Sequence, residues 1–381
     1  MDVETLKNEL NRCIGCKTKP CEKACPLGVS PHDFIALAKT GNYKEASKII
    51  ALKNPLPQTC GLVCPDTFCQ KACIRGRIDK PIEIPCLQAQ MIKLGGLEKL
   101  EFPAKNGKKI AVVGGGPAGI GATFELIING YEVTIFEKSD KLGGVARLIP
   151  EYRLPKEILD NEIARIVDNE RVTVKLNTEI ADFSVLKTEF DDVILALGEP
   201  VECKLNVVGD DVCVSYKEVL GDCNSSLADL SLNKIAVVGG GEVALDCALS
   251  LKKQNPNLIV EMFVRRRKED MRIMKKDHLE LEAHNVIIRD LTSIIEIKNN
   301  NNVLDFVAIK NEINEEGKAR SIAGSEFNLL GYSQVITALG SYFPKENKVE
   351  FLCAGDMAGN CGTVVQAIAS GMKVARSIME L

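Results

Sequence analysis

Two stretches of the chain repeat one pattern of strand, glycine turn, helix and second strand. The first, "KIAVVGGGPAGIGATFELIINGYEVTIFEK", covers residues 109–138, and the second, "KIAVVGGGEVALDCALSLKKQNPNLIVEMFVRRR", covers residues 234–267. Segments 110–114 and 235–239 are identical and start 125 residues apart. This repeat predicts an α/β chain with two Rossmann-like βαβ folds, each built on a parallel sheet.

The first glycine turn has the spacing of a dinucleotide site. Glu137 ends the strand that follows and lies eighteen residues after the last glycine of the turn, where an acid binds an unphosphorylated ribose. The glycines permit a tight turn, and the free N–H groups of the next helix attract a pyrophosphate. A tight turn with nothing bound is the structural alternative. The G-x-G-x-x-G turn contains Gly114, Gly116, Pro117, Ala118 and Gly119.

The second turn, Gly239–x–Gly241–x–x–Ala244, lacks an acid at the end of its next strand. That strand ends in Arg265, Arg266 and Arg267, and Arg272 follows closely. Arginine at this point suits the 2′-phosphate of NADPH through charge-assisted hydrogen bonds. A basic strand end that is merely solvated is the structural alternative. The contrast between the two turns suggests FAD at the first and NADPH at the second.

Three further segments have the sequence pattern of a strand followed by a turn of small residues, which is typical of turns that face a cofactor. "DDVILALGE" (191–199) and "SQVITALGS" (333–341) are near copies, and each is an apolar strand that ends in small residues, where backbone can pass close to a cofactor. "FLCAGDMAGNCGTVVQAIASGMKVA" (351–375) predicts a strand, a glycine-rich turn and a helix that starts near Thr363. The candidate cofactor contacts here are Ala196, Gly198, Ala338, Gly340, Gly355, Asp356, Thr363 and Val364.

Nine of the fifteen cysteines lie between Cys13 and Cys86, in a region rich in Pro and Gly. "RCIGCKTKPCEKACP" (12–26) has the spacing C-x2-C-x4-C-x3-C-P, and "CGLVCPDTFCQKAC" (60–73) forms a second run. Zinc favours two separated C-x2-C pairs or cysteine with histidine, and only one C-x2-C occurs here. The C-x3-C-P ending is typical of ferredoxin runs whose last cysteine binds the other cluster. We therefore expect two [4Fe–4S] clusters with crossed ligation, with zinc as the alternative.

In combination these motifs resemble the glutamate synthase small-subunit family of pyridine-nucleotide flavoproteins. The same architecture occurs in the N-terminal half of dihydropyrimidine dehydrogenase and in the large subunit of NADH-dependent ferredoxin:NADP oxidoreductase. The resemblance runs from Cys13 to the C-terminal helix and includes "GGVARLIPEYRLP" (143–155), which is similar to a stretch beside the flavin.

The resemblance implies an FAD-binding domain that is split by an inserted NAD(P)H-binding domain. The implied parts are a helical iron–sulfur domain over 1–105, FAD-binding segments over 106–205 and 326–381, and an NAD(P)H-binding domain over 206–325. Asp356 would meet the ribityl or phosphate region of the flavin. The other implied FAD contacts are Glu137, Lys138, Leu142, Gly143, Arg153 and Ile180, and the implied NADPH contacts are Gly240, Gly241, Glu242, Val243, Arg265, Arg266 and Arg272.

The resemblance also implies which residues bind each cluster. Cys25, Cys64 and Cys69 would hold three irons of one cluster, with Gln88 of "KPIEIPCLQ" (80–88) on the fourth. Cys86 is the alternative fourth ligand because thiolate is the better iron ligand, and Cys60 would be a bystander. The other cluster would be held by Cys13, Cys16, Cys21 and Cys73.

Size and charge bound the remaining possibilities. A chain of 381 residues suggests two or three domains. Its net charge of −4 implies no strongly basic face for nucleic acid. The sequence contains no run of eighteen apolar residues, so no membrane span is expected. The first residues lack the pattern of a secretory signal, and we therefore expect a cytoplasmic protein.

The expected activity follows from the cofactors. NADPH gives two electrons at once, iron–sulfur clusters accept one each, and flavin does both. We therefore expect an NAD(P)H-dependent oxidoreductase that exchanges electrons with ferredoxin or a partner redox subunit. Hydride transfer needs positioning rather than an acid or base, so no catalytic residue is predicted. The alternatives are an electron-relay subunit without activity alone and, less favoured because no C-x-x-C occurs after residue 16, a thioredoxin reductase-like enzyme.

Overall fold

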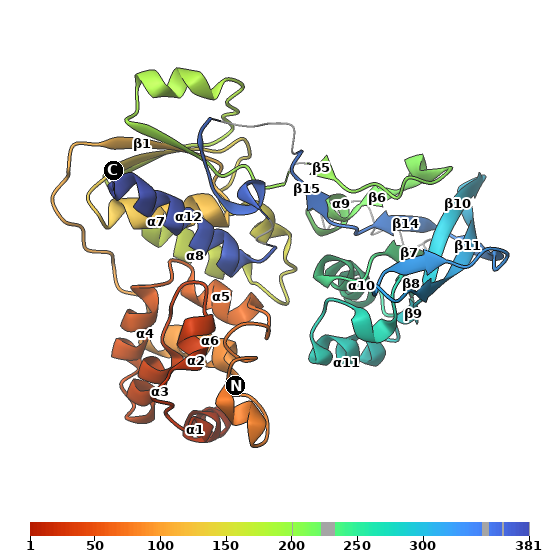
Figure 1. Cartoon of the computed structure of the whole chain (residues 1–381), viewed down its shortest axis with the longest axis horizontal. Coiled ribbons are helices and arrows are strands. Elements are labelled where there is room, and N and C mark those ends of the chain that lie inside the picture. Colours follow the sequence, from red (N-terminus) through yellow and green to blue (C-terminus); the bar gives the residue numbers. More distant parts are fainter. Residues whose placement is uncertain (200, 222–232, 345–349, 360–361, 381) are drawn as a thin grey trace. The chain divides into compact units, whose positions relative to one another are not determined.

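The computed structural model describes residues 1–199, 201–221, 233–344, 350–359 and 362–380 (Figure 1). The chain folds into two compact units. The first unit comprises Met1–Arg147, Glu151–Pro200 and Phe343–Leu381, and the second comprises Leu148–Pro150 and Val201–Tyr342.

The first unit begins with a helical domain that contains both cysteine runs. Proline stands at the start of several of its helices, where a missing N–H costs nothing. Phe34, Ile50 and Leu87 are fully buried and form its core with neighbouring apolar side chains. The helices are α1 (Val3–Arg12), α2 (Pro20–Ala24), α3 (Pro31–Lys39), α4 (Tyr43–Ala51), α5 (Pro57–Val63) and α6 (Ile84–Gly95), with a 3-10 turn η1 (Ile74–Arg77) between the last two.

A parallel five-stranded sheet follows in the same unit, with strand order β16-β4-β1-β2-β3. Its central strands are buried on both faces, which explains their unbroken apolar sequence. The sheet confirms the first predicted βαβ fold. Its strands are β1 (Lys109–Val113), β2 (Glu132–Phe136), β3 (Val172–Lys175), β4 (Asp192–Leu195) and β16 (Leu352–Cys353), and its main helices are α7 (Pro117–Ile127), α8 (Lys156–Val167) and α12 (Val364–Met379).

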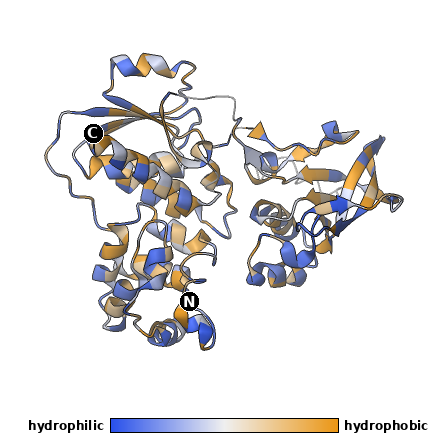
Figure 2. Cartoon of the chain, in the orientation of Figure 1, coloured by the Kyte–Doolittle hydropathy of each residue, from blue (hydrophilic) through white to orange (hydrophobic). Residues whose placement is uncertain are grey.

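Helices α7 and α12 pack closely although they are far apart in the sequence (Figure 1). A Cβ added at Gly371 would lie 1.9 Å from the carbonyl oxygen of Ala118, and one at Gly121 would lie 2.5 Å from that of Ile368. Arg376 and Glu125 form a bidentate ion pair at 2.9 Å beside this contact. Figure 2 shows that α12 carries both hydrophobic and hydrophilic residues, as expected of a helix with one buried face.

The second unit contains another parallel sheet, with order β6-β14-β7-β8-β9. It confirms the second predicted βαβ fold, because β7 leads through a glycine turn into α10. The strands are β6 (Val214–Ser215), β7 (Lys234–Val238), β8 (Ile259–Phe263), β9 (Ile287–Arg289) and β14 (Gln334–Thr337), and the helices are α9 (Tyr216–Gly221), α10 (Glu242–Gln254) and α11 (Lys275–Ala283).

Antiparallel strands complete the second unit. In one sheet β11 pairs with β10, β12 and β13, and in another β15 pairs with β5. Phe306 and Tyr332 stack within the first of these sheets at a centroid distance of 4.3 Å. The strands are β5 (Val201–Glu202), β10 (Thr292–Asn300), β11 (Val303–Ile313), β12 (Ala319–Ser321), β13 (Phe327–Tyr332) and β15 (Ser341–Tyr342).

The structure changes unit later than the predicted boundary at residue 326. β13 pairs with β11, and β14 pairs with β7, so both strands belong to the second unit, which ends at Tyr342. The near copies at 191–199 and 333–341 therefore lie in different sheets. The assignment of cofactors to the predicted ranges 1–105, 106–205, 206–325 and 326–381 stays a prediction.

A buried carboxylate joins the helical domain to the first sheet's domain. Glu162 of α8 is only 1% exposed. Its two oxygens accept hydrogen bonds from the backbone N–H groups of Gln58 and Thr59, in the first turn of α5, the latter at 2.9 Å. Burial raises the pKa of Glu162 to about 7, because it outweighs the hydrogen bonds from Thr59 and Gln58.

Among the described residues, no helix has the length and apolarity needed to span a bilayer.

We expect Gly371→Ala to lower the free energy of unfolding of the first unit by about 2 kcal/mol, because the added methyl overpacks the contact with Ala118. Thermal unfolding measures this change. Lys373→Ala, on the exposed side of α12, is the control and should leave the midpoint nearly unchanged. Equal midpoints for the two variants would contradict the close packing of α7 and α12.

A second prediction concerns pH. The folded-state pKa of Glu162 lies above the ordinary value of 4.5, so the protonated form stabilises the fold below about pH 4.5 and this contribution is lost as pH rises through about 7. Relative to Glu162→Gln, wild-type stability should fall by on the order of 3 kcal/mol across this range. Unfolding curves between pH 5 and 8 measure most of that slope. The exposed Glu157→Gln should keep the wild-type slope, and parallel curves for wild type and Glu162→Gln would refute the assignment.

Candidate functional site

The first glycine turn lies between β1 and α7 at the carboxyl edge of the first sheet. Gly114 has φ +104°, and a Cβ there would lie 2.3 Å from the carbonyl oxygen of Ala196. A Cβ at Gly119 would lie 1.9 Å from the carbonyl oxygen of Gly114, so both positions require glycine. Gly116 caps α7 without a side-chain hydrogen bond, and Pro117 and Ala118 form its first turn. The amides at this helix start are therefore available to an anionic ligand.

Glu137 is held beside this turn rather than in solvent. It is 7% exposed, and its Oε2 accepts a hydrogen bond from the N–H of Gly115 at 2.7 Å. Its Oε1 accepts bonds from the N–H and hydroxyl of Ser139 at 2.9 and 2.8 Å. Gly115, which was not predicted as a site residue, leaves room for the buried Leu142, since a Cβ there would lie 2.3 Å from Leu142 Cδ2.

Other predicted residues converge on the same sheet edge. The N–H of Gly143 donates to the carbonyl of Gly115 at 2.8 Å, and Lys138 is exposed after Glu137. Ile180 follows β3 and packs against the apolar cluster under this edge. Arg153 lies in the turn before α8 and is half-buried. The placement of Arg153 against a cofactor stays a prediction.

The C-terminal segment completes this edge. The N–H of Ala354, just before Gly355, donates to the carbonyl of Leu195 at 2.8 Å, next to Ala196 and Gly198. Asp356 Oδ1 accepts a hydrogen bond from Gly362 N–H at 2.9 Å. Burial, followed by the charge of Asp356, raises the pKa of Glu199. The edge therefore carries the turn after β1, the end of β4 and the turn before α12, whose cap is Thr363 and first residue Val364.

The second glycine turn has the same construction in the other unit. Gly239 has φ +150°, and a Cβ there would lie 2.3 Å from the carbonyl oxygen of Ala338. Arg272 N–H donates to the carbonyl of Gly240 at 3.0 Å, which places Arg272 beside the turn. Gly241 caps α10, whose first residues are Glu242 and Val243, while Gly340 lies two residues beyond Ala338.

The arginines after β8 lie at the carboxyl edge of this second sheet. The side chains of Arg265 and Arg272 are exposed, and that of Arg266 is half-buried. Their backbone is fixed, since Arg266 O accepts from Leu291 N–H at 2.9 Å. In the part of the chain that the structure describes, none of these three guanidinium groups has a carboxylate partner. They are therefore available to an anionic ligand.

Four of the cysteines line one cavity of the helical domain. Its empty volume is about 410 Å³, part of it open to solvent. Ile14, Lys19, His32 and Arg75 are also in its lining. Burial, followed by the neighbouring thiols of Cys73 and Cys13, raises the pKa of Cys21 to about 11. The cavity cysteines are Cys13, Cys16, Cys21 and Cys73, the set that the family resemblance implies for one cluster.

The remaining cysteines of the two runs form a second group. Burial, followed by the neighbouring thiols of Cys25 and of Cys21 from the cavity group, raises the pKa of Cys69 to about 12. A hydrogen bond with Cys60, followed by burial, raises the pKa of Cys64 well above its usual range, and Cys69 and Cys25 add to this effect. The structure thus brings Cys25, Cys64 and Cys69 together. It also places the buried Cys60, which was predicted to be a bystander, beside Cys64.

Gln88 and Cys86 differ in surroundings. Gln88 is 8% exposed, and its Nε2 donates to the carbonyl of Pro57 at 2.7 Å, in the helix that ends before Cys64. Cys86 is exposed on α6.

The described residues contain no group of three His, Cys, Asp or Glu side chains arranged to hold a single metal ion. That criterion concerns one ion, whereas a [4Fe–4S] cluster binds each thiolate at a different iron. Two groups of buried or half-buried thiols, one around a cavity, are the donor set that such clusters require.

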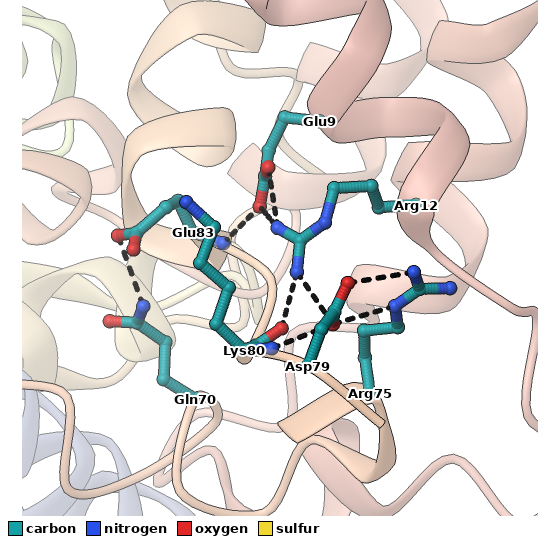
Figure 3. A network of polar contacts seen from close by, with 7 residues as sticks. All are labelled: Glu9, Arg12, Gln70, Arg75, Asp79, Lys80 and Glu83. Atoms are coloured by element: carbon teal, nitrogen blue, oxygen red, sulfur yellow. Dashed lines mark hydrogen bonds and ion pairs between the residues drawn. The ribbon is translucent and has the colours of Figure 1, made fainter. Parts of the chain in front are cut away.

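A polar network braces the cavity (Figure 3). Arg12, next to Cys13, bonds both carboxylate oxygens of Glu9 at 2.9 and 2.7 Å and Asp79 Oδ1 at 3.0 Å. Arg75 clasps Asp79 through two bonds of 2.8 Å, which hold the pKa of that carboxyl well below its usual range. Glu9 Oε1 also accepts from Glu83 N–H at 2.8 Å. The network ties the end of α1 to the loop after Cys73, and its seven members are Glu9, Arg12, Gln70, Arg75, Asp79, Lys80 and Glu83.

Comparison with known families accounts for both halves of the chain. Residues 1–95 match the family described as dihydropyrimidine dehydrogenase domain II, 4Fe-4S cluster. Residues 108–371 match the family described as pyridine nucleotide-disulphide oxidoreductase.

Several curated proteins are similar along nearly the whole chain. The NAD-dependent dihydropyrimidine dehydrogenase subunit PreT of Salmonella typhimurium is 31% identical over 97% of this chain and 92% of its own length. The small chain of NADPH glutamate synthase of Escherichia coli is 25% identical over 98% of this chain and 90% of its own. The beta subunit of NADP(+)-dependent formate dehydrogenase of Moorella thermoacetica is 29% identical over 95% of this chain and 59% of its own.

Among solved structures, Mycobacterium tuberculosis FprA in complex with NADPH has a TM-score of 0.63 at 17% identity, over 72% of this chain and 84% of that one. The likeness shows the fold. Together the matches confirm the predicted fold class, the oxidoreductase activity and the cofactor classes FAD, NAD(P)H and [4Fe–4S]. The chain therefore belongs to the pyridine nucleotide-disulphide oxidoreductase family and carries an N-terminal 4Fe–4S cluster domain over residues 1–95.

Proposed function

We propose that the chain oxidises NADPH and delivers the electrons one at a time to a partner redox protein. FAD, when bound, exchanges a hydride with the nicotinamide and single electrons with iron–sulfur clusters. The observation that carries the proposal is the position of the cysteine cavity, which lies in the same compact unit as the first glycine turn and Glu137.

The first sheet's edge supplies the FAD contacts in this proposal. The free amides of α7 bind the pyrophosphate, and Glu137, whose position is set by Gly115 and Ser139, accepts from the ribose hydroxyls. Asp356 and the turn before α12 would contact the ribityl or phosphate region of the flavin. No side chain acts as general acid or base, because hydride transfer needs only alignment. His32, His278 and His284 are assigned no role.

For the clusters, we assign the cavity cysteines to one and Cys25, Cys64 and Cys69 to the other. Gln88 is the proposed fourth ligand of the second, because it is buried against α5 whereas Cys86 is exposed. The buried Cys60 thiol, which is hydrogen-bonded with Cys64, is the competing donor. The many cysteines that this ligation requires as free thiolates stay reduced in a reducing compartment, which supports a cytoplasmic location.

For the nucleotide, we infer a preference for NADPH over NADH. Arg265 and Arg266 follow β8 where an acid would favour NADH, and no carboxylate among the described residues neutralises them. Arg272 lies against the glycine turn and would contact the same phosphate.

The partner is proposed to be a ferredoxin or a second subunit. PreT, the glutamate synthase small chain and formate dehydrogenase subunit beta are, by their names, parts of larger enzymes. The second candidate function, a relay that works only within such a complex, rests on this observation. If so, the isolated chain would reduce dyes with NADPH but transfer little to ferredoxin until a co-purifying protein is added.

Anaerobically purified protein should contain about eight irons and one FAD per chain, and NADPH should bleach the flavin absorbance. Cys64→Ser should lower the iron content by about half, whereas Cys86→Ser, at an exposed position two residues from Gln88, should keep all of it. Zinc in place of iron would refute the cluster assignment and leave a flavin reductase with a zinc-bound N-terminal domain.

Arg265→Ala combined with Arg266→Ala should raise the KM for NADPH by about 10- to 100-fold, because two charge-assisted hydrogen bonds to the 2′-phosphate are lost. The KM for NADH should stay within about twofold. Steady-state dye reduction with each nucleotide measures both values. Lys276→Ala, an exposed cation on α11, is the control. An unchanged KM for NADPH in the double variant would rule out the 2′-phosphate contact.

A further inference from the structure

The charge of the chain is unevenly distributed. Residues 1–95 carry fourteen Lys and Arg against nine Asp and Glu, a net charge of +5, although the whole chain has a net charge of −4. The rest of the chain, with thirty-four basic and forty-three acidic residues, is therefore strongly acidic. The helical domain is a positively charged body within an acidic protein.

Several of its cations gather beside the cysteine cavity. Lys19 and Arg75 line the cavity itself. Lys17, next to Cys16, and Arg77 and Lys80, which follow the loop from Cys73, are exposed. The network of Figure 3 fixes this loop against Arg12, so the chain segments that carry these cations adjoin residues that line the cavity.

The carboxylates near the cavity are paired with cations, and Glu22 shares Lys19 with Asp33, its Oε2 lying 3.7 Å from Lys19 Nζ. Asp33 is paired with Lys19 at 2.8 Å, and Asp79 is paired with Arg75 at 2.8 Å and with Arg12 at 3.0 Å. Lys17, Arg77 and Lys80, three exposed cations of this region, have no carboxylate within ion-pair distance among the described residues.

Two large apolar side chains are exposed among these charges. Ile14, in the cavity lining, is 47% exposed, and Ile78 is 63% exposed. An apolar centre with a charged rim is typical of protein–protein interfaces, and the charges raise the association rate of an oppositely charged partner.

The cavity is also formed by parts of the helical domain other than the helix that contacts the first sheet's domain. The domain meets the first sheet's domain through α5, which contacts α8 and α12 and carries the carboxylate joint to Glu162. The cavity lining comes from the end of α1, α2, the start of α3, the loop after Cys73 and the start of α6, and includes no described residue of α5. Of the two cysteine groups, the cavity group is the one set apart from that joint.

We propose that the surface formed by Ile14, Lys17, Arg77, Ile78 and Lys80, which we name the docking face, binds an acidic one-electron carrier protein beside the cavity cysteines. The proposal rests on the proposed function and adds the place of electron exit and the charge of the partner.

The test compares two double charge reversals of the loaded protein under anaerobic conditions. Lys17→Glu with Arg77→Glu alters the docking face. Lys48→Glu with Lys53→Glu changes the net charge equally on exposed residues of α4 and the turn after it, away from the cavity lining, and is the matched control. The probe is a purified acidic ferredoxin with two four-iron clusters. The measurements are its binding in the oxidised form by calorimetry, its NADPH-driven reduction at several salt concentrations, and iron content.

The docking-face variant should keep its iron but bind the ferredoxin at least tenfold more weakly at low salt, with a flattened salt dependence of kcat/KM. The control variant should stay within threefold of wild type. Equal effects of the two variants, or salt-independent binding by the wild type, would overturn the docking face. If the wild-type protein did not reduce dyes with NADPH, this result would instead contradict the proposed function.

Discussion

The helical domain and the first sheet's domain are joined by a buried polar contact, in which the carboxylate of Glu162 accepts hydrogen bonds from two backbone amides of α5. The amides at a helix start need acceptors, and a carboxylate from α8 supplies them at the cost of its own desolvation. Because α5 ends at Val63 with Cys64 as its C-cap, this contact helps to set the position of the second cysteine group relative to the sheet edge that carries the first glycine turn. The same unit is closed by α12, whose Gly371 allows α7 to approach and so places Asp356 and Thr363 beside that turn.

The two parallel sheets share one backbone arrangement at their carboxyl edges but differ in the charged side chains that follow it. Each places a glycine turn and a helix start at its carboxyl edge, with a second strand ending in small residues close by, at Ala196 in one and Ala338 in the other. The difference lies in the charge that follows. Glu137 is buried and accepts hydrogen bonds at both oxygens, whereas the exposed Arg265 and half-buried Arg266 have no carboxylate partner among the described residues. A carboxylate such as Glu137, which is held in place by hydrogen bonds, is suited to accept from neutral hydroxyl groups. Guanidinium groups without a carboxylate partner, such as those of Arg265 and Arg266, are suited to bind an anion.

Much of this could be predicted from sequence, because local patterns carry it. The identical strands, their glycines and the cysteine spacing are short-range signals, and the structure confirms both βαβ folds. The boundary at 326 differed because "SQVITALGS" resembles "DDVILALGE", and only pairing with β7 reveals its sheet. Glu162 and Gly115 were missed because a lone acid and an extra glycine have no local signature. Cys60 and Cys64 are neighbours because they lie four residues apart on α5 and its C-cap, whereas the burial of Gln88 arises from the packing of α5 on α6.

The crossing of the two cysteine runs has a consequence for how the helical domain matures. Cys21 and Cys25 are four residues apart yet stand in different thiol groups, and so do Cys69 and Cys73. Neither group can be completed by one loop, so both loops must be in place before either group is whole. Loss of a single thiol affects one group, but displacement of a whole loop, for example by proteolytic cleavage, would open both groups at once.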